Sequence, residues 1–390
     1  MFKKWISVIL SLACALSLSA CWDHTEITSM LIVAGIGLDV DDSGKIYHAV
    51  VEVINVEEEG GENITAKLVE GSGSSIYAAI QDAMVMTGGT LYTNHCKVVV
   101  IGDKLARQGI DGVIDLVLRS PNLRKTLGVL VAKDATARSI LTQKTVKNDI
   151  VSFELSKMLT SNEVTLNNTR TTGIYQLHEA FISVCPSAVA SVVSVKENNG
   201  ERVLYIEGLS VFWDQRCVGY LDGSRSGAYN LASHTVNTGS IILLDPALSA
   251  QPFGVNILQS KAGYTPYIQG DRLVMQVDIQ VDATLQGGAL LQVDLSDKNA
   301  VNQLEISLER KLEADVKNLI SHVQSEYGAD IFNFYKEFEN RYRREWEGLS
   351  QDWQSHFKNL EVEVTADVVM GGSGLIENYA PHGEAANALP

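Results

Sequence analysis

The last third of this 390-residue chain constrains the fold most, because two different hydrophobic periodicities follow one another there. Apolar residues recur every three or four positions from Val301 to Val323, a pattern typical of a long amphipathic helix. From Leu360 to Val368, apolar and polar residues alternate, which predicts a half-buried β-strand. A core that accepts both elements has to combine helices with a β-sheet.

A stripe of large, mostly aromatic side chains lies between these two elements. Its members follow one another at spacings of three or four residues and are Phe338, Tyr342, Trp346, Leu349, Trp353 and Phe357. Such spacing indicates a second helical region. We interpret the stripe as a face that packs into the core, not as a platform that binds a ligand.

The first half of the chain alternates between short apolar strands and helical patterns. Met30–Asp39 and Ile46–Val56 are predicted to form a β-hairpin, and Ser74–Met86 a helix. Further short strands and helices are expected at 97–101, 105–117, 127–131 and 135–141. Later strands are expected at 185–195, 203–212, 241–244 and 273–285. The segment 222–240 is rich in Gly and Ser and is predicted to be a loop or linker.

These patterns predict an α+β protein of two or three mixed α/β domains, with antiparallel or mixed sheets and long C-terminal helices. The predicted division is a signal peptide at 1–20, an N-terminal α/β domain at 21–195 and a C-terminal α+β domain at 200–372. The last of these has a possible split near 245–270. The Gly- and Ala-rich residues 373–390 are predicted to be a disordered tail.

The first twenty residues have the pattern of a lipoprotein signal peptide. Lys3 and Lys4 precede an apolar run, Trp5–Leu18, that would span about 21 Å as a helix, too short for a hydrocarbon core of about 30 Å. The run ends in Leu18-Ser19-Ala20-Cys21, which matches a bacterial lipobox. We therefore predict that the Cys21 thiol receives a diacylglyceryl group. The alternative is a soluble secreted protein.

Removal of residues 1–20 would leave a 370-residue body with 29 basic and 47 acidic residues, a formal charge of −18. Such acidity excludes nucleic-acid binding, whose affinity comes from neutralising phosphates with Lys and Arg. It also means that an anionic lipid surface would repel the body. The lipid tether, and not a basic patch, would have to hold the body at the membrane.

Motifs that carry catalysis or bind metals are absent from the sequence. The eight His residues form neither HExxH nor a zinc spacing with Cys, and there is no GxSxG or Walker loop. We predict no enzyme, no metal and no cofactor. Cys96, Cys185 and Cys217 are odd in number and lack a CxxC spacing, so they are predicted to be buried free thiols.

Short segments, in order along the whole chain, resemble the Ger(x)C spore germination lipoproteins, which are the C subunits of nutrient germinant receptors. In the first half they are Cys21-Trp22-Asp23, Glu26-Ile27, Gly35–Asp39, Gly73–Ile76, Leu91-Tyr92, His95–Lys97, Leu105–Arg107, Gly109-Ile110, Asp115, Arg119 and Arg124. In the second half they are Gly208–Phe212, Val218–Leu221, Ala329–Phe332, Trp346, Trp353 and Phe357.

Two departures from the family pattern concern the C-terminal region. Phe334-Tyr335 stands where the family often has a glycine, and Arg343-Arg344-Glu345 precedes Trp346 where a proline is frequent. Without that proline, the helix that carries the aromatic stripe is expected to run unbroken.

The resemblance implies a non-catalytic receptor subunit, lipid-anchored on the outer face of the spore inner membrane. It implies a polytopic A subunit and a membrane-spanning B subunit as partners, and nutrient-triggered germination as the process served. Cys21 is the one site residue that the resemblance transfers to this chain, and neither a nutrient nor a ligand residue is identified. A solute-binding lipoprotein of a membrane importer is the alternative, and a cell-envelope hydrolase is a third hypothesis.

Overall fold

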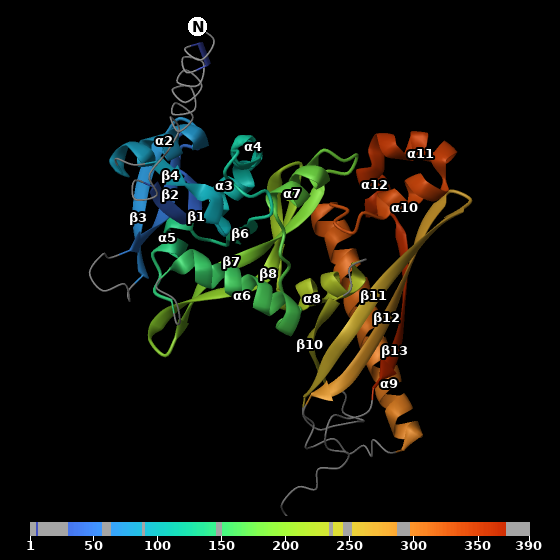
Figure 1. Ribbon diagram of the computed structural model, residues 1–390. Coiled ribbons are helices and arrows are strands. Elements are labelled where there is room, and N and C mark those ends of the chain that lie inside the picture. The colour runs from blue at the N-terminus through green and yellow to red at the C-terminus, as the bar shows by residue number, and fades with distance from the viewer. Residues whose placement is uncertain are drawn as a thin grey trace, which may run out of the picture.

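The computed structural model describes residues 5–6, 30–56, 64–87, 90–145, 150–233, 237–244, 252–286 and 297–371. Strands β1 to β9 build one mixed sheet and β10 to β13 build a second one, with helices packed against both (Figure 1). The predicted α+β fold with mixed sheets and a long C-terminal helix is confirmed. The predicted signal peptide, apart from Trp5 and Ile6, and the predicted tail lie outside the described residues.

The first sheet has the strand order β3-β2-β1-β5-β6-β7-β8-β9, with β4 beside β1. Its strands are Met30–Val40 (β1), Tyr47–Val56 (β2), Ile64–Gly73 (β3), Thr90–Tyr92 (β4), Val98–Gly102 (β5), Gly128–Ala132 (β6), Ser187–Asn198 (β7), Glu201–Trp213 (β8) and Arg216–Leu221 (β9). Parallel pairs join β1, β5, β6 and β7 at the centre, and antiparallel strands flank them on both sides. The predicted β1–β2 hairpin is confirmed.

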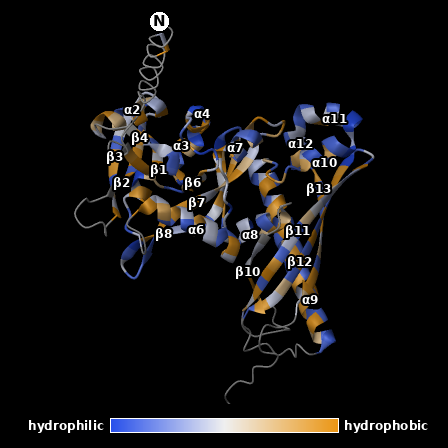
Figure 2. Cartoon of the chain, viewed as in Figure 1, coloured by the Kyte–Doolittle hydropathy of each residue, from blue (hydrophilic) through white to orange (hydrophobic). Residues whose placement is uncertain are grey.

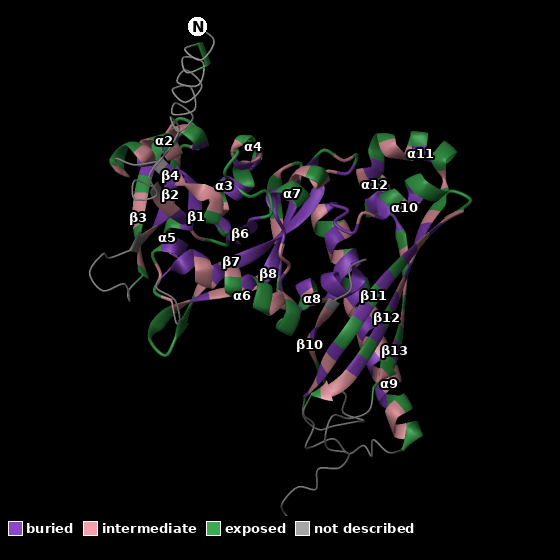
Figure 3. Cartoon of the chain, in the orientation of Figure 1, coloured by how far each residue is buried: buried purple, intermediate pink, exposed green. Residues whose placement is uncertain are grey.

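Helices cover both faces of this sheet. One face carries α2 (Ile76–Thr87), α3 (Asp103–Gln108), α4 (Asp111–Arg119) and α7 (Ile174–Phe181), and the other carries α5 (Ala137–Leu141) and α6 (Val151–Leu166). Consecutive residues such as Val99 and Val100 of β5 therefore point into two different apolar cores. Every residue of β5 and β6 is buried, as expected for parallel strands covered on both sides (Figure 3).

The second sheet has the order β10-β11-β12-β13, and its strands are Asn237–Leu243 (β10), Phe253–Gln269 (β11), Arg272–Gln286 (β12) and Glu361–Met370 (β13). Helix α9 (Lys298–His322) packs on one face and buries Leu304, Leu308, Leu312 and Val316. The opposite face is largely open, so hydrophobic and hydrophilic residues alternate along β11 and β12 (Figure 2). The predicted helix over 301–323 and the predicted strand over 360–368 are both confirmed.

Three glutamates of α9 pair with the free edge of β13. Oε1 of Glu305, Glu309 and Glu313 accepts hydrogen bonds from the backbone N–H groups of Met370, Val368 and Ala366, at 2.9, 3.2 and 3.0 Å. Four helical residues rise about 6 Å and two strand residues about 6.6 Å, so the two repeats stay in step. We call this set the glutamate ladder. It occupies edge donors that would otherwise be open to a foreign strand.

The aromatic stripe faces the apolar core of the second sheet and its helices, which we call the second core, as predicted, but the helix that carries the stripe is broken. Phe338 and Phe357 are fully buried, and Trp346 and Trp353 are 7% and 3% exposed. The prediction of one unbroken helix is wrong. The stripe divides among α10 (Phe334–Arg341), α11 (Arg343–Leu349), the 3₁₀ turn η5 (Ser350–Asp352) and α12 (Trp353–Lys358).

Clustering of the aromatic rings explains this break. The ring of Trp353 lies 5.3 Å from that of Phe338 and 5.4 Å from that of Trp346. On a straight helix Phe338 and Trp353 would be about 22 Å apart, so the chain has to fold back to gather them. The fold-back occurs at Tyr342, whose backbone leaves the helical region (φ −123°, ψ 56°).

The prediction of a loop or linker over 222–240 is also wrong in part, because this segment contains α8 (Gly223–Ala232). The side chain of Asp222 caps the helix by accepting from the backbone N–H of Arg225 at 2.8 Å. The buried residues Tyr229 and Leu231 then join the second core. Small and polar residues around these apolar ones concealed the helical periodicity.

Strands β8 and β9 belong to the first sheet, although they follow the predicted domain boundary at 195–200. The boundary falls on the turn of the β7–β8 hairpin, where Asn199 and Gly200 have positive φ angles of 53° and 81°. β8 and β9 pair as an antiparallel hairpin, in which Leu209 lies opposite Leu221. The division of the chain into domains stays a prediction.

Candidate functional site

The predicted lipidation site, Cys21, lies outside the described residues, so the structure adds no geometry to it. Among the residues that the structure does describe, no helix is both long enough and apolar enough to span a lipid bilayer. Other residues that carry the family resemblance lie within the described part of the chain. Several of them hold helices onto the two sheets.

The segment Gly35–Asp39 fixes α5 against the end of β1. Asp39 is 7% exposed, and its carboxylate accepts backbone N–H groups of Ala137 and Arg138 at 2.8 and 3.0 Å. Burial raises the pKa of Asp39, although the two hydrogen bonds and the charge of His48 oppose the rise. Asp39 thus supplies acceptors to a helix N-terminus, whose first N–H groups have no intrahelical partner.

Glu52 in the middle of β2 does the same for α6. Its two carboxylate oxygens accept from the backbone N–H groups of Val151 and Ser152, at 2.7 and 2.8 Å. Burial raises the pKa of Glu52, and the bonds to Ser152 and Val151 oppose it. Gly35 lies opposite Glu52 in the sheet, and a Cβ there would meet Ser152 at 1.9 Å, so the glycine allows α6 to approach closely.

Asp330, in the family segment Ala329–Phe332, is the corresponding group of the second core. Its carboxylate accepts the backbone N–H groups of Phe334 and Tyr335 at 3.1 and 3.0 Å, and the indole N–H of Trp353 at 2.9 Å. The side chain is fully buried, and desolvation raises its pKa to about 6. Asp330 therefore joins the start of α10 to the start of α12.

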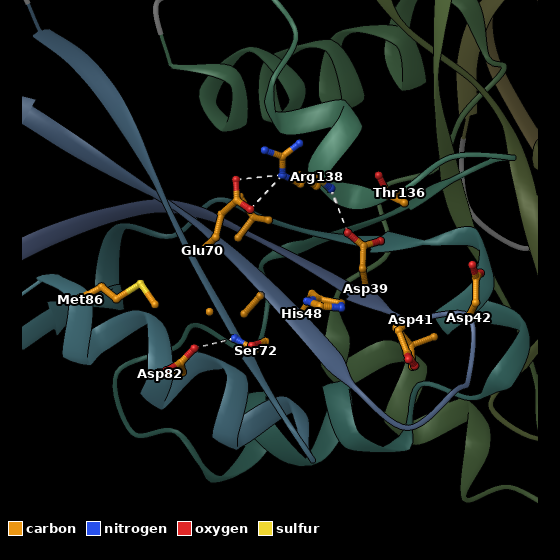
Figure 4. Close-up of a pocket in the computed structure, with 14 residues that line it drawn as sticks. Asp39, Asp41, Asp42, His48, Glu70, Ser72, Asp82, Met86, Thr136 and Arg138 are labelled. Atoms are coloured by element: carbon orange, nitrogen blue, oxygen red, sulfur yellow. Dashed lines mark hydrogen bonds and ion pairs between the residues drawn. The ribbon is translucent and has the colours of Figure 1, made fainter.

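A cleft of about 730 Å³ opens beyond the carboxyl end of β1, between β2, β3, α2 and α5 (Figure 4). On one side, Nε of Arg138 donates to both carboxylate oxygens of Glu70 at 2.9 Å. On the other, the backbone N–H of Ser72 donates to Asp82 at 2.9 Å. His48 lies between these two pairs (Figure 4).

The cleft offers charge but no catalytic arrangement. Glu70 and Arg138 are about half exposed and occupied with each other, and such a pair contributes at most about 1 kcal/mol to stability. Among the lining residues, the hydroxyl of Thr136 accepts the backbone N–H of Ser139 and thereby caps α5. Within the described residues, no group of His, Cys, Asp and Glu side chains is arranged to hold a metal ion.

Cys96, Cys185 and Cys217 are free and buried, as predicted. Burial raises the pKa of Cys96 and Cys185 to about 12, and it also raises the pKa of Cys217. At neutral pH all three are protonated thiols without nucleophilic character. They are core residues.

Sequence reasoning missed Glu52, Glu70 and Arg138. Glu52 had a usable signal, because a single acidic residue inside the apolar strand Tyr47–Val56 must find buried donors. The sequence holds no comparable signal for Glu70 and Arg138, because these two residues are 68 positions apart and come together only in the fold.

Comparisons with known proteins agree with the resemblance. Residues 23–195 match the family model described as "Spore germination protein N-terminal domain", and residues 207–374 match "Spore germination B3/ GerAC like, C-terminal". The chain is 23% identical to spore germination protein KC of Bacillus subtilis, over 98% of this chain and 99% of that protein. It is 21% identical to spore germination protein B3 of the same organism, over 89% and 92%.

A solved structure shares the fold. The crystal structure of the GerBC protein aligns with 87% of this chain and 98% of that chain, with a TM-score of 0.54 and 18% sequence identity. The chain belongs to the GerAC-like spore germination protein family, the family of germinant receptor C subunits.

Proposed function

We propose that this chain is the lipid-anchored, non-catalytic C subunit of a nutrient germinant receptor, needed for receptor assembly and for germination in response to a nutrient. The observation that carries the proposal is the succession of the two family matches over nearly the whole chain after the lipobox. The structural roles of Asp39 and Asp330 support it, because family residues that could have been catalytic serve as helix caps.

The anchor proposed is a thioether between the Cys21 sulfur and a diacylglyceryl group, formed as the thiol loses its proton and the donor lipid loses its head group. Cleavage between Ala20 and Cys21 would then release the leader. Two or more acyl chains are needed for stable attachment. We propose the outer face of the spore inner membrane as the location, where the body would lie beside polytopic A and B subunits.

Labelled palmitate tests the anchor. The wild-type protein is expected to incorporate the label and to sediment with membranes, whereas Cys21→Ala is expected to lose both properties. Cys96→Ala is the matched control, because this buried thiol is not expected to carry lipid. Equal labelling of wild type and Cys21→Ala would contradict the proposed site.

Deletion of the gene tests the receptor role. In a strain that lacks paralogous receptors, we expect spores without the gene to stay refractile when given the nutrients that trigger the wild type. Complementation with the wild-type gene should restore the response. Unchanged responses to every nutrient in the deletion strain would contradict the proposal. An importer binding protein, the alternative, would need a cleft between two α/β lobes, whereas the described cleft lies at the margin of one sheet.

A further inference from the structure

Helix α2 exposes apolar side chains that no described part of the chain covers. Its buried residues Ile76, Ala79 and Ala83 face the apolar core that α2 shares with α3, α4, α7 and the first sheet. On the outside, Val85 and Met86 are 81% and 68% exposed at the C-terminal end of the helix. A surface helix ordinarily carries charged or polar residues on the side away from the core.

Charge is almost absent from this helix. Asp82 is the one charged residue among Ile76–Thr87, and it accepts the backbone N–H of Ser72, so its carboxylate is directed toward β3. The exposed Tyr77, at 64%, adds an amphipathic ring near the start of the helix. Such a surface suits the boundary between lipid head groups and acyl chains better than it suits water.

The exposed end of α2 is close to the point where the chain arrives from Cys21. Thr90 follows the last residue of α2 by three positions, so the two lie at most about 10 Å apart. Thr90 pairs with Met30, the first residue of β1, at a strand separation of about 5 Å. Cys21 precedes Met30 by nine residues and can reach at most about 30 Å from it. A lipid on Cys21 therefore keeps this end of the first sheet near the bilayer.

We propose that the C-terminal end of α2, with Val85 and Met86, inserts into the interfacial layer of the bilayer and sets the orientation of the body on the membrane. This inference rests on the proposed anchor at Cys21. A bilayer is favoured over a protein partner as the occupant because the tether itself brings this surface to lipid. An acidic body of charge −18 approaches anionic lipid most easily through a weakly charged surface, and Val85 at the end of α2 is 81% exposed, while the neighbouring Met86 also lines the cleft with Asp82 and Glu70.

Site-specific fluorescence tests the contact. Val85→Cys would carry an NBD group on the acylated protein, reconstituted in vesicles of phosphatidylethanolamine and phosphatidylglycerol. The three body thiols are buried and protonated, so the new thiol is the reactive one. Ile242→Cys is the matched control, because Ile242 is also apolar and 70% exposed but lies on β10 of the second sheet.

We expect the label at 85 to shift to the blue in vesicles, to be quenched by nitroxide phospholipids and to be several-fold less accessible to iodide than the label at 242. Equal iodide accessibility at the two positions in an acylated protein would overturn the inference. So would protection at 85 that arises only when partner proteins are added to the vesicles, since that would identify a protein contact.

Failure of the α2 contact can be told apart from failure of the proposed function. Palmitate incorporation and the germination response report the anchor and the receptor role without any label at 85. An acylated, germination-competent protein whose residue 85 stays in water would disprove the α2 contact alone. If the chain is never acylated, the tether does not exist, and the proposed α2 contact is disproved together with the anchor.

Discussion

The two sheets differ in how their surfaces are protected. Helices cover both faces of the first sheet, and its central strands are uniformly apolar. The second sheet has one covered face, one open face and a free edge at β13 that the glutamate ladder occupies. In the first sheet, carboxylates of the strands accept hydrogen bonds from the N-termini of the covering helices, whereas in the second sheet carboxylates of the covering helix accept hydrogen bonds from a strand edge.

Carboxylate side chains accept backbone hydrogen bonds in both sheets, but their environments differ. Asp39 and Glu52 are buried under α5 and α6 and cap these helices, whereas Glu309 of the ladder is half-buried and pairs with a strand edge. The loss of a buried partner leaves donors that water cannot reach, and it is expected to cost more than the loss of an accessible one.

The largest effects are expected from charges placed in β5. Val99→Asp and Val100→Asp should each destabilise the protein by about 4 kcal/mol or more, because neighbouring residues there face separate cores. In β12, Val277→Asp should be equally severe, but Gln280→Glu should stay within about 0.5 kcal/mol, because Gln280 is exposed on the open face between Lys261 and Asp367. Urea unfolding followed by circular dichroism measures all four variants. A mild effect at either β5 position would show that one face of the first sheet is not a true core.

Loss of the Asp330 carboxylate is expected to come next. Asp330→Ala leaves the N–H groups of Phe334, Tyr335 and Trp353 without an acceptor, at an expected cost of about 3–5 kcal/mol. The matched control is Asp352→Ala, which removes an exposed helix cap and should cost about 1 kcal/mol. Equal losses in thermal or urea unfolding would contradict the role given to Asp330.

The pH dependence of the free energy of unfolding gives a second test of Asp330. Burial raises the pKa of Asp330 to about 6 from 3.8, so the folded state binds this proton more tightly than the unfolded state does. The stability from this group is present below about pH 4 and is lost as the pH rises toward 6. The advantage of wild type over Asp330→Asn should therefore shrink across that range. An advantage that grows with pH would mean that the buried carboxylate is stabilised as an anion.

A smaller effect is expected at the edge of the second sheet. Glu309→Ala should cost about 1–2 kcal/mol and should speed hydrogen exchange at the amide of Val368, which loses its acceptor. Glu309→Gln keeps an acceptor oxygen and should behave more like wild type. Unchanged exchange at Val368 in Glu309→Ala would show that the ladder does not protect the edge.

Much of the second sheet could be predicted because α9 and β13 each have one apolar and one polar side. The periodicity over 301–323 and the alternation over 360–368 follow directly from that exposure. β3, α6 and α8 were not predicted, because their apolar residues follow no clean period. The broken helix after Phe338 depends on ring contacts between residues far apart in sequence, which no local pattern records.

The residues of the candidate site likewise include some that could be predicted from the sequence and others that could not. Cys21 was predicted because a lipobox is a contiguous signal read by an enzyme before the chain folds. The cleft residues Glu70 and Arg138 come from separate elements and only the fold brings them together. The family segments around Asp39 and Asp330 could be recognised in the sequence, but their role as helix caps required the structure.

Co-isolation from spore inner membranes tests whether this chain is a subunit of a receptor complex. Membranes from spores that carry a tagged version of this chain would be solubilised in mild detergent, and the proteins recovered with the tag would be identified and quantified. Two polytopic membrane proteins are expected in fixed proportion to the wild-type chain, and they should be lost from that fraction when Cys21→Ala is tagged instead. Recovery of the folded, acylated chain without polytopic partners would contradict the assignment as a receptor subunit.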